Sequence, residues 1–228
     1  MPMFKPETEW VPPTHLPDLK EHKEIAIDLE TRDPNLLTMG SGSVRGDGEV
    51  IGIAVAVEGW SGYFPINHEG GGNMDRAVVL DWFEEVLHTE STKIFHNAMY
   101  DVSWIRSMGY TINGGIIDTL IAASLINENR WGYSLNALGK EYTGMGKNEK
   151  VLQAAAKEWG VNPKSEMWRL PAPLVGEYAE QDAVVTLKLW HVLQNEIAKQ
   201  DLWDVFNLET NLFPCLVDMK FKGVRVDI

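Results

Sequence analysis

The sequence predicts an α/β domain of three layers built on a mixed sheet. Three observations lead to this fold class. Three strand-like stretches follow one another between residues 24 and 66, and alternating helical and strand-like segments come after them. The last third of the chain is mostly helical in pattern, so helices are available to cover both faces of the sheet.

The first three strands are predicted to form an antiparallel meander. Residues 24–30 alternate between apolar and polar side chains, as a strand with one polar face does. Residues 50–57 are apolar and β-branched, and residues 60–66 follow the Glu58-Gly59 turn. The Gly/Ser-rich residues 39–48 are predicted to be a turn or a flexible loop.

Short apolar runs and helical periodicity predict the other elements. Strands at residues 93–96 and 116–117 bring the sheet to five. A helix capped by Asn73 carries Val79 and Phe83 on its apolar side. Further helices are expected over residues 98–108, 118–127, 134–141 and 149–159, and from a first turn at Pro173 to about residue 200.

Composition limits the possible function classes. No apolar run reaches the ~18–20 residues of a membrane-spanning helix, and residues 1–10 do not resemble an export signal. Cys215 is the one cysteine, so a reduced, cytoplasmic compartment is expected. The formal net charge of −13 opposes binding of nucleic acid by electrostatics alone. Weak intrinsic affinity for DNA is therefore expected.

Acidic residues occur at positions where a core side chain is expected. Asp28 and Glu30 are two residues apart at the end of an apolar strand, so their side chains share one face. Asp101 lies on the apolar stripe of the helix 98–108, with Asn97 one turn earlier. Solvated acids at a strand end, and an acid favoured by the helix dipole, are the alternative interpretations.

Asp182 repeats this pattern in the long C-terminal helix. It shares a stripe with Val185 and Leu189, and Tyr178 precedes it by one turn on the same side. Burial of several carboxylates without partners is costly, so cations are implied. Clusters of carboxylates suit Mg²⁺ or Mn²⁺, and two such ions can assist cleavage of a phosphodiester.

Three segments together resemble the motifs of the DEDD exonucleases. Asp28-Leu29-Glu30-Thr31 is similar to the first motif, residues 96–101 to the second (Asn-x-x-x-Phe/Tyr-Asp), and residues 178–183 to the third. The resemblance covers residues 20–200. In the histidine form of the third motif a His stands where this chain has Glu177, so Tyr178 identifies the tyrosine form. That form is typical of proofreading domains of family A DNA polymerases and of ribonuclease D-like enzymes.

The resemblance implies a fold, a cofactor and a set of roles. The fold would be ribonuclease-H-like, a three-layer α/β/α arrangement with a mixed five-stranded sheet. Asp28, Glu30 and Asp182 would hold one divalent cation, Mg²⁺ or Mn²⁺, and Asp28 with Asp101 a second. Tyr178 and Glu30 would orient the attacking water, and the product would be a nucleoside 5′-monophosphate.

Substrate contacts are also implied by position. Asn97 is expected to touch the substrate or the backbone of the metal site. Thr31 and Leu36 or Leu37 follow the first motif and are candidates for the terminal nucleotide, although a core role is favoured for either leucine. Trp60 and Trp131, which lie in turns, are candidates for stacking on bases.

The domain boundaries and partners follow from the same resemblance. Residues 1–23 are expected to be an N-terminal arm, residues 24–203 the exonuclease domain, and residues 204–228 the start of a truncated polymerase domain or of a split gene. Residues 209–227 resemble the beginning of family A polymerase domains, and residues 167–172 resemble the bacteriophage members. The expected partners are a single-stranded DNA 3′ end and a polymerase domain in the same or a companion chain. The location would be a bacterial or phage-infected cytoplasm.

Two other functions remain open from the residues alone. A ribonuclease D-like RNA exonuclease carries the same tyrosine form of the third motif. A catalytically inactive module that only binds nucleic acid is the alternative from another class, and the presence of all four acids argues against it.

Overall fold

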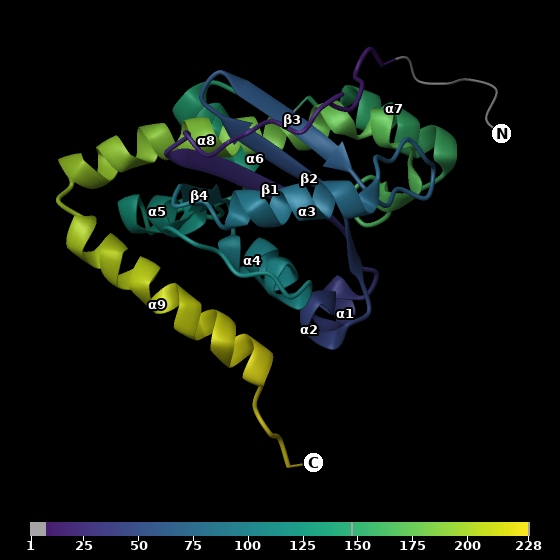
Figure 1. Ribbon diagram of the computed structural model, residues 1–228. Coiled ribbons are helices and arrows are strands. Elements are labelled where there is room, and N and C mark those ends of the chain that lie inside the picture. The colour runs from purple at the N-terminus through teal and green to yellow at the C-terminus, as the bar shows by residue number, and fades with distance from the viewer. Residues whose placement is uncertain (1–7, 147, 228) are drawn as a thin grey trace.

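The computed structural model describes residues 8–146 and 148–227, and its centre is a mixed five-stranded sheet (Figure 1). The strand order is β3-β2-β1-β4-β5. Strand β1 pairs antiparallel with β2 and parallel with β4, so the central strand joins the meander to the parallel half. The strands are β1 (Glu24–Arg32), β2 (Glu49–Val57), β3 (Trp60–Pro65), β4 (Thr92–Phe95) and β5 (Ile116–Asp118). The predicted meander and five-stranded mixed sheet are confirmed.

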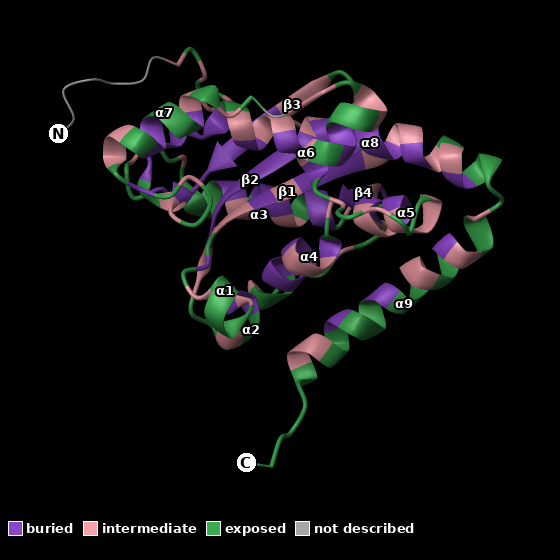
Figure 2. Cartoon of the chain, turned by 180° about the vertical axis from the view of Figure 1, so that it is seen from behind, coloured by how far each residue is buried: buried purple, intermediate pink, exposed green. Residues whose placement is uncertain are grey.

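Helices cover both faces of the sheet, as Figures 1 and 2 show. One face packs against α5, α6, α7 and α8, and the other against α3 and α4. The helices are α1 (Leu36–Met39), α2 (Gly42–Arg45), α3 (Arg76–Leu87), α4 (Ala98–Ser107), α5 (Thr119–Ile126), α6 (Leu135–Leu138), α7 (Lys150–Trp159), α8 (Gly176–Lys199) and α9 (Trp203–Lys222). The three-layer α/β/α architecture is therefore confirmed. No helix in the described ranges is both long and apolar enough to cross a bilayer.

Alternation along β1 divides its side chains between two cores. Ile25, Ile27 and Leu29 belong to the core beneath α3 and α4. Ala26 belongs to the core beneath α8, and Asp28 and Glu30 follow it on that face at intervals of two residues. The acids therefore lie on the face that α8 covers.

The turn or flexible loop predicted over residues 39–48 is wrong for Gly42–Arg45, which form the one-turn helix α2, and for Met39, the last residue of α1; the other residues of the segment lie outside helices. The Ser41 side chain accepts a hydrogen bond from the Ser43 N–H, and Gly46 ends α2 in the left-handed conformation. The carboxylate of Asp33 also accepts the Gly42 N–H. These local side-chain and backbone bonds hold turns that composition alone classes as loop.

Helix starts also differ from prediction. Asp75, not Asn73, caps α3, with its side chain accepting from Val78 N at 3.1 Å. The Asn73 amide instead bonds both backbone groups of His68. Pro173 lies in a separate 3₁₀ turn before α8 begins at Gly176.

Two further boundaries shift as well. The helix expected over 134–141 is α6 followed by a π-helical turn at Gly139–Thr143. Asp118 is the N-cap of α5 rather than its first residue.

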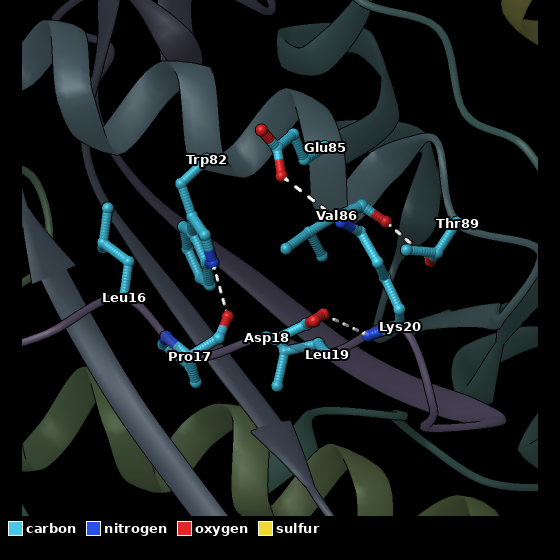
Figure 3. A pocket seen from close by; sticks show the side chains of 9 residues that line it. All are labelled: Leu16, Pro17, Asp18, Leu19, Lys20, Trp82, Glu85, Val86 and Thr89. Atoms are coloured by element: carbon cyan, nitrogen blue, oxygen red, sulfur yellow. Dashed lines mark hydrogen bonds and ion pairs between the residues drawn. The ribbon is translucent and has the colours of Figure 1, made fainter.

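The N-terminal arm lies against the domain over its described part, residues 8–23. Leu19 is buried, and the indole N–H of Trp82 on α3 donates to the Pro17 carbonyl at 2.8 Å (Figure 3). The Trp10 ring lies where a Cβ on Gly176 would be, at 2.3 Å, so only glycine fits at the start of α8. The indole N–H of Trp10 donates to the Glu180 carboxylate at 3.0 Å. The arm thus holds the start of α8 in place.

Candidate active site

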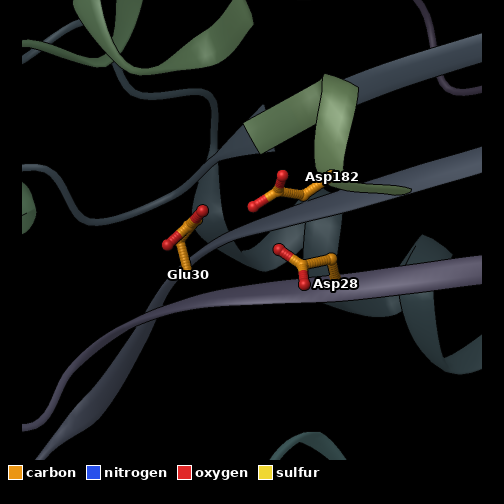
Figure 4. A group of neighbouring side chains, drawn as sticks. All are labelled: Asp28, Glu30 and Asp182. Carbon is orange, nitrogen blue, oxygen red and sulfur yellow. The ribbon is translucent and has the colours of Figure 1, made fainter. Parts of the chain in front are cut away.

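Three carboxylates converge where α8 crosses β1 (Figure 4). Asp28 and Glu30 extend from β1 and Asp182 from α8, and each offers an oxygen within 4.8 Å of the others. The register between β1 and β2 shifts between Glu30 and Thr31, a bulge at the point where the acidic pair ends. Bulges near functional sites redirect side chains, and this one lies directly after Glu30. Side chains 152 residues apart in sequence therefore form one group.

Small side chains let α8 lie close to the sheet. Ala179 and Ala183 on the helix are fully buried, and they belong to the same core as Ala26 and Ala54 on the strands. Bulkier residues at these positions would hold the helix farther from the strands. The short Asp182 side chain, itself buried, reaches the strand acids because of this close approach.

Tyr178 lies next to all three acids. Burial, followed by the negative charges of Asp182, Glu30 and Asp28, raises the pKa of its hydroxyl well above the usual range. The phenol therefore stays protonated at neutral pH and is able to donate a hydrogen bond beside the carboxylates. This placement agrees with the predicted stripe of Tyr178 and Asp182 on one side of the long helix.

Asp101 lies apart from the group of three, close to Asp28. Its Oδ1 accepts a hydrogen bond from the backbone N–H of Leu29 at 3.0 Å, and its side chain is buried. Burial and then the charge of Asp28 raise the pKa of Asp101 well above its ordinary value. The predicted stripe position is confirmed, and the structure brings the fourth acid beside the cluster rather than within it.

Asn97 lies at the turn between β4 and α4, in the left-handed conformation with φ 66°. Its backbone N–H and that of Ala98 donate to the two oxygens of Asp118, at 2.9 and 2.8 Å. The Asn97 side chain is exposed and lines a groove that also contains Asp28 and Asp182. Asn97 thus lies beside Asp28 and Asp182 in that groove, and its predicted contact with a substrate stays a prediction.

Asp118 was not predicted as a site residue. It is buried, it caps α5 through Leu120 N at 2.9 Å, and it holds the first turn of α4 at the same time. An acid between a short strand and a helix is a capping signal, and the sequence contained it. Its second role, toward a turn 20 residues earlier in the chain, depends on β5 lying beside β4.

The residues after the first motif have mixed outcomes. The Thr31 hydroxyl lies 2.6 Å from the hydroxyl of Tyr100, which also donates to Asp33 at 3.3 Å. Leu36 and Leu37 are on α1 and are exposed, Leu37 to 94%. The core role favoured for these leucines is therefore wrong. Their predicted contact with the terminal nucleotide, and that of Thr31, stays a prediction.

The buried, hydrogen-bonded pair of Tyr63 and His68 was also not predicted from the sequence. The Tyr63 hydroxyl lies 2.6 Å from Nε2 of His68, whose Nδ1 donates to the Leu170 carbonyl at 3.0 Å. A Cβ on Gly52, the β2 partner of Glu30, would lie 2.0 Å from the Tyr63 hydroxyl, so glycine is required there. Burial lowers the pKa of His68 to about 4. The neutral ring therefore accepts from Tyr63 while it donates to Leu170.

A mixed sheet with two acids on its central strand and a third on the covering helix is the arrangement of the ribonuclease-H-like fold, with a cluster of carboxylates that could hold a metal ion. Among solved structures, Brucella melitensis NrnC superposes with a TM-score of 0.67 at 19% identity, covering 93% of this chain and 94% of that one. The model of the 3′-5′ exonuclease family found in family A DNA polymerases matches residues 14–198, and the chain belongs to this family.

Curated relatives agree with this assignment. A DNA-directed DNA polymerase of Pseudomonas phage M6 is 39% identical over 227 residues, covering 96% of this chain and 34% of that protein. The DNA polymerase DpoZ of Salmonella phage PMBT28 is 31% identical over 218 residues, covering 92% of this chain and 32% of that protein. This chain thus spans about a third of the length of these phage polymerases.

Proposed function

We propose that this domain removes nucleoside 5′-monophosphates from the 3′ ends of single-stranded or frayed DNA, as the proofreading part of a family A DNA polymerase. The convergence of Asp28, Glu30 and Asp182 carries the proposal. Three carboxylates within 4.8 Å repel one another unless a cation lies among them. Their oxygen ligands match the preference of Mg²⁺ and Mn²⁺.

Two divalent ions, with Mg²⁺ as the natural choice, are proposed for this site. Asp28, Glu30 and Asp182 would hold the first, and Asp28 with Asp101 the second. When bound, such ions lower the pKa of an attacking water and stabilise charge on the leaving oxygen. Asp101 is supported in this role by its position next to Asp28, where burial alone makes its ionised form costly.

The other site residues would position water and substrate. The protonated Tyr178 hydroxyl and the Glu30 carboxylate would orient the attacking water toward the terminal phosphorus. Asn97 would contact the strand in the groove, and Thr31 and Leu36 would contact the terminal nucleotide. Trp131 is fully exposed, and Tyr133, two residues later, lines the same groove as Asp28 and Asp182.

The partner of this activity would be a polymerase domain. The phage relatives are polymerases of which this chain matches about a third, so a polymerase domain in the same or a companion chain is proposed. Since a paired end must open before it reaches the groove, mismatched termini would be preferred. Residues 204–228 as the start of that domain, and a cytoplasmic location, stay predictions.

The direct test is digestion of a 5′-labelled single-stranded DNA with Mg²⁺. The parent chain is expected to shorten it from the 3′ end one nucleotide at a time, and EDTA to stop the reaction. Asp182→Asn is expected to lose at least about 100-fold in rate, because even partners of metal ligands cost 10–100-fold when removed. Glu196→Gln on the same helix, whose carboxylate pairs with Lys199, serves as the control.

Matched RNA separates the ribonuclease D-like alternative. Faster digestion of RNA than of DNA with the same sequence would replace the proposed substrate. Binding of DNA without cleavage under Mg²⁺ and under Mn²⁺ would identify an inactive module instead.

A further inference from the structure

The space beside Glu30 is filled from strand β3. Gly52 on β2 is the cross-strand partner of Glu30, and it has no side chain to occupy the surface between β1 and β3. The Tyr63 ring lies there instead, because a Cβ on Gly52 would be 2.0 Å from the Tyr63 hydroxyl oxygen and 2.2 Å from its Cζ. Since paired Cβ atoms on adjacent strands are about 4.5–5.5 Å apart, the hydroxyl oxygen lies within about 8 Å of the Glu30 Cβ.

The strand register places Tyr63 on the face of the sheet that carries the acids. Tyr63 pairs with Ala54, and Ala54 pairs in turn with Asp28, so these residues form one row across β3, β2 and β1. Tyr63 is fully buried, in the core beneath α8. Burial raises the pKa of its hydroxyl well above the usual range, and the charges of Glu30 and Asp28 raise it further. The phenol therefore stays protonated beside both acids.

The one proton of the Tyr63 hydroxyl is donated to His68. A carbonyl can only accept, so Nδ1 of His68 carries the hydrogen that is donated to the Leu170 carbonyl at 3.0 Å. Nε2 of the neutral ring is then the acceptor for the Tyr63 O–H, across 2.6 Å. The Tyr63 oxygen consequently offers only lone pairs to its other neighbours. It can accept a hydrogen bond from a water, and it does not compete with a cation for the oxygens of Glu30.

His68 is itself held in place from two sides. Its backbone N–H donates to the Asn73 side chain at 2.6 Å, and the Asn73 amide donates back to the His68 carbonyl at 2.8 Å. Leu170, whose carbonyl orients the ring, is buried in the segment that leads into α8. The Tyr63 hydroxyl is thus fixed relative to α8 as well as to β1, the two elements that supply the acids.

We propose that Tyr63, oriented by His68, is a positioning residue that directs the Glu30 carboxylate into the metal site. The inference rests on the metal-dependent function proposed above and adds a residue that holds one of the proposed ligands. The negative end of the hydroxyl dipole repels a carboxylate, so Glu30 is turned away from β3 and toward Asp28 and Asp182. Residues behind a metal ligand commonly fix its orientation in this way.

Binding of Mn²⁺ to the full 228-residue chain tests the proposal without turnover. Tyr63→Phe keeps the ring and removes the oxygen. Electron paramagnetic resonance should show Mn²⁺ bound about tenfold more weakly, the lower range for loss of a residue that orients a metal ligand. On single-stranded DNA kcat should fall while KM stays near the parental value, because the fully buried side chain does not reach the substrate. A lower Tm with unchanged Mn²⁺ affinity would make Tyr63 purely structural and overturn the proposal.

Two further comparisons separate positioning from stability. Phe64→Leu changes the next residue of β3, which is fully buried in the core on the opposite face of the sheet. It should lower Tm and leave the Mn²⁺ affinity unchanged, and a loss equal to that of Tyr63→Phe would assign the effect to a loosened strand. In a Glu30→Gln background, Tyr63→Phe should not weaken Mn²⁺ binding further, because two residues that act as one unit are not additive. Additive losses would show that Tyr63 does not act through Glu30.

Two substitutions of His68 test the direction of the hydroxyl proton. Gln can place an acceptor near the position of Nε2, so His68→Gln should keep the Mn²⁺ affinity near the parental value. Asn reaches only the position of Nδ1, which leaves the Tyr63 proton able to turn toward Glu30 and compete with the cation. His68→Asn should therefore bind Mn²⁺ about tenfold more weakly. Equal affinities in the two variants would contradict the proposed orientation.

The parent protein distinguishes failure of this inference from failure of the proposed function. A parent that binds no Mn²⁺ would contradict the metal site itself, before any variant is compared. A parent that binds Mn²⁺ and does not cleave DNA would contradict the exonuclease function alone, since the affinities of the Tyr63 and His68 variants are measured without catalysis.

Discussion

The Asp101 carboxylate accepts the backbone N–H of Leu29 at 3.0 Å, which ties α4 to β1 between Asp28 and Glu30. A strand N–H lies in the plane of the sheet, and β4 pairs with β1 only over residues 24–26, so Asp101 accepts this N–H beyond the paired part of β4. Asp101 thus has a structural role in holding the acidic strand as well as a proposed role with a metal ion. The two roles predict different effects for different substitutions.

Asp101→Asn is expected to separate these roles. The amide oxygen can still accept from Leu29, and loss of a buried charge near Asp28 should leave the metal-free protein at least as stable as the parent. Asp101→Ala leaves the Leu29 N–H without its acceptor and should cost about 1–3 kcal/mol in free energy of unfolding. Urea denaturation in EDTA measures both. Exonuclease activity should fall in both variants, and an active Asp101→Asn would remove Asp101 from the proposed metal site.

Tyr178→Phe tests orientation of the attacking water. The variant keeps the ring and loses the hydroxyl that lies among the acids. The turnover number should drop by about 100-fold, the lower range for a positioned proton-handling group. The KM for DNA and the affinity for Mn²⁺, measured by electron paramagnetic resonance, should stay near parental values. A weaker Mn²⁺ affinity with a matching loss of rate would assign the tyrosine to the metal site instead.

Metal should stabilise the folded domain because it relieves the repulsion of Asp28, Glu30 and Asp182. Saturating Mg²⁺ is expected to raise Tm by about 5 °C or more, as binding to the native state alone predicts. Asp182→Asn should show a higher Tm than the parent in EDTA and a smaller response to Mg²⁺. Calorimetry with Ca²⁺ as a second ion checks this without turnover. An equal Mg²⁺ response in both proteins would place the ion elsewhere.

Trp131 and Trp60 offer a matched pair for base stacking. Trp131 is fully exposed, whereas Trp60 is partly buried and lies against Gly62 and the ring of Phe64. Trp131→Ala should raise the KM for single-stranded DNA by about tenfold, which corresponds to one stacked base, without changing Tm. Trp60→Ala should lower Tm and leave KM unchanged. An unaltered KM in the first variant would exclude stacking on Trp131.

His68 should make stability depend on pH in mildly acidic solution. The buried ring has a pKa of about 4, below the ordinary value of 6.5, so below pH 6.5 the unfolded chain binds the proton first. The stability that the neutral His68 ring contributes is therefore fully present above pH 6.5. It is lost as the pH falls toward 4, by about 3 kcal/mol in free energy of unfolding. His68→Gln should flatten this part of the profile in urea titrations. The parent and variant curves would run parallel if His68 were not responsible.

The local pattern of apolar and polar residues was sufficient to predict the strands, the long helix and the acids of the site. An acid on an apolar stripe is visible without coordinates, because strand and helix periodicities alone decide which residues share a face. Asp28, Glu30, Tyr178 and Asp182 were found in this way, and the structure places them together. The caps at Asp75 and Asp118 were misread, because neighbouring polar residues compete for one position and only the backbone path selects between them.

The sequence alone determined the class of chemistry, since the order and spacing of the three motifs need no tertiary information. Only the tertiary structure decided that Asp101 bonds to the Leu29 N–H and lies outside the cluster of Asp28, Glu30 and Asp182. It also decided that Tyr63 and His68 form a buried hydrogen bond. Apart from the Tyr63–His68 bond itself, which spans five residues, these features depend on contacts between segments far apart in the chain, whose distances no local periodicity encodes.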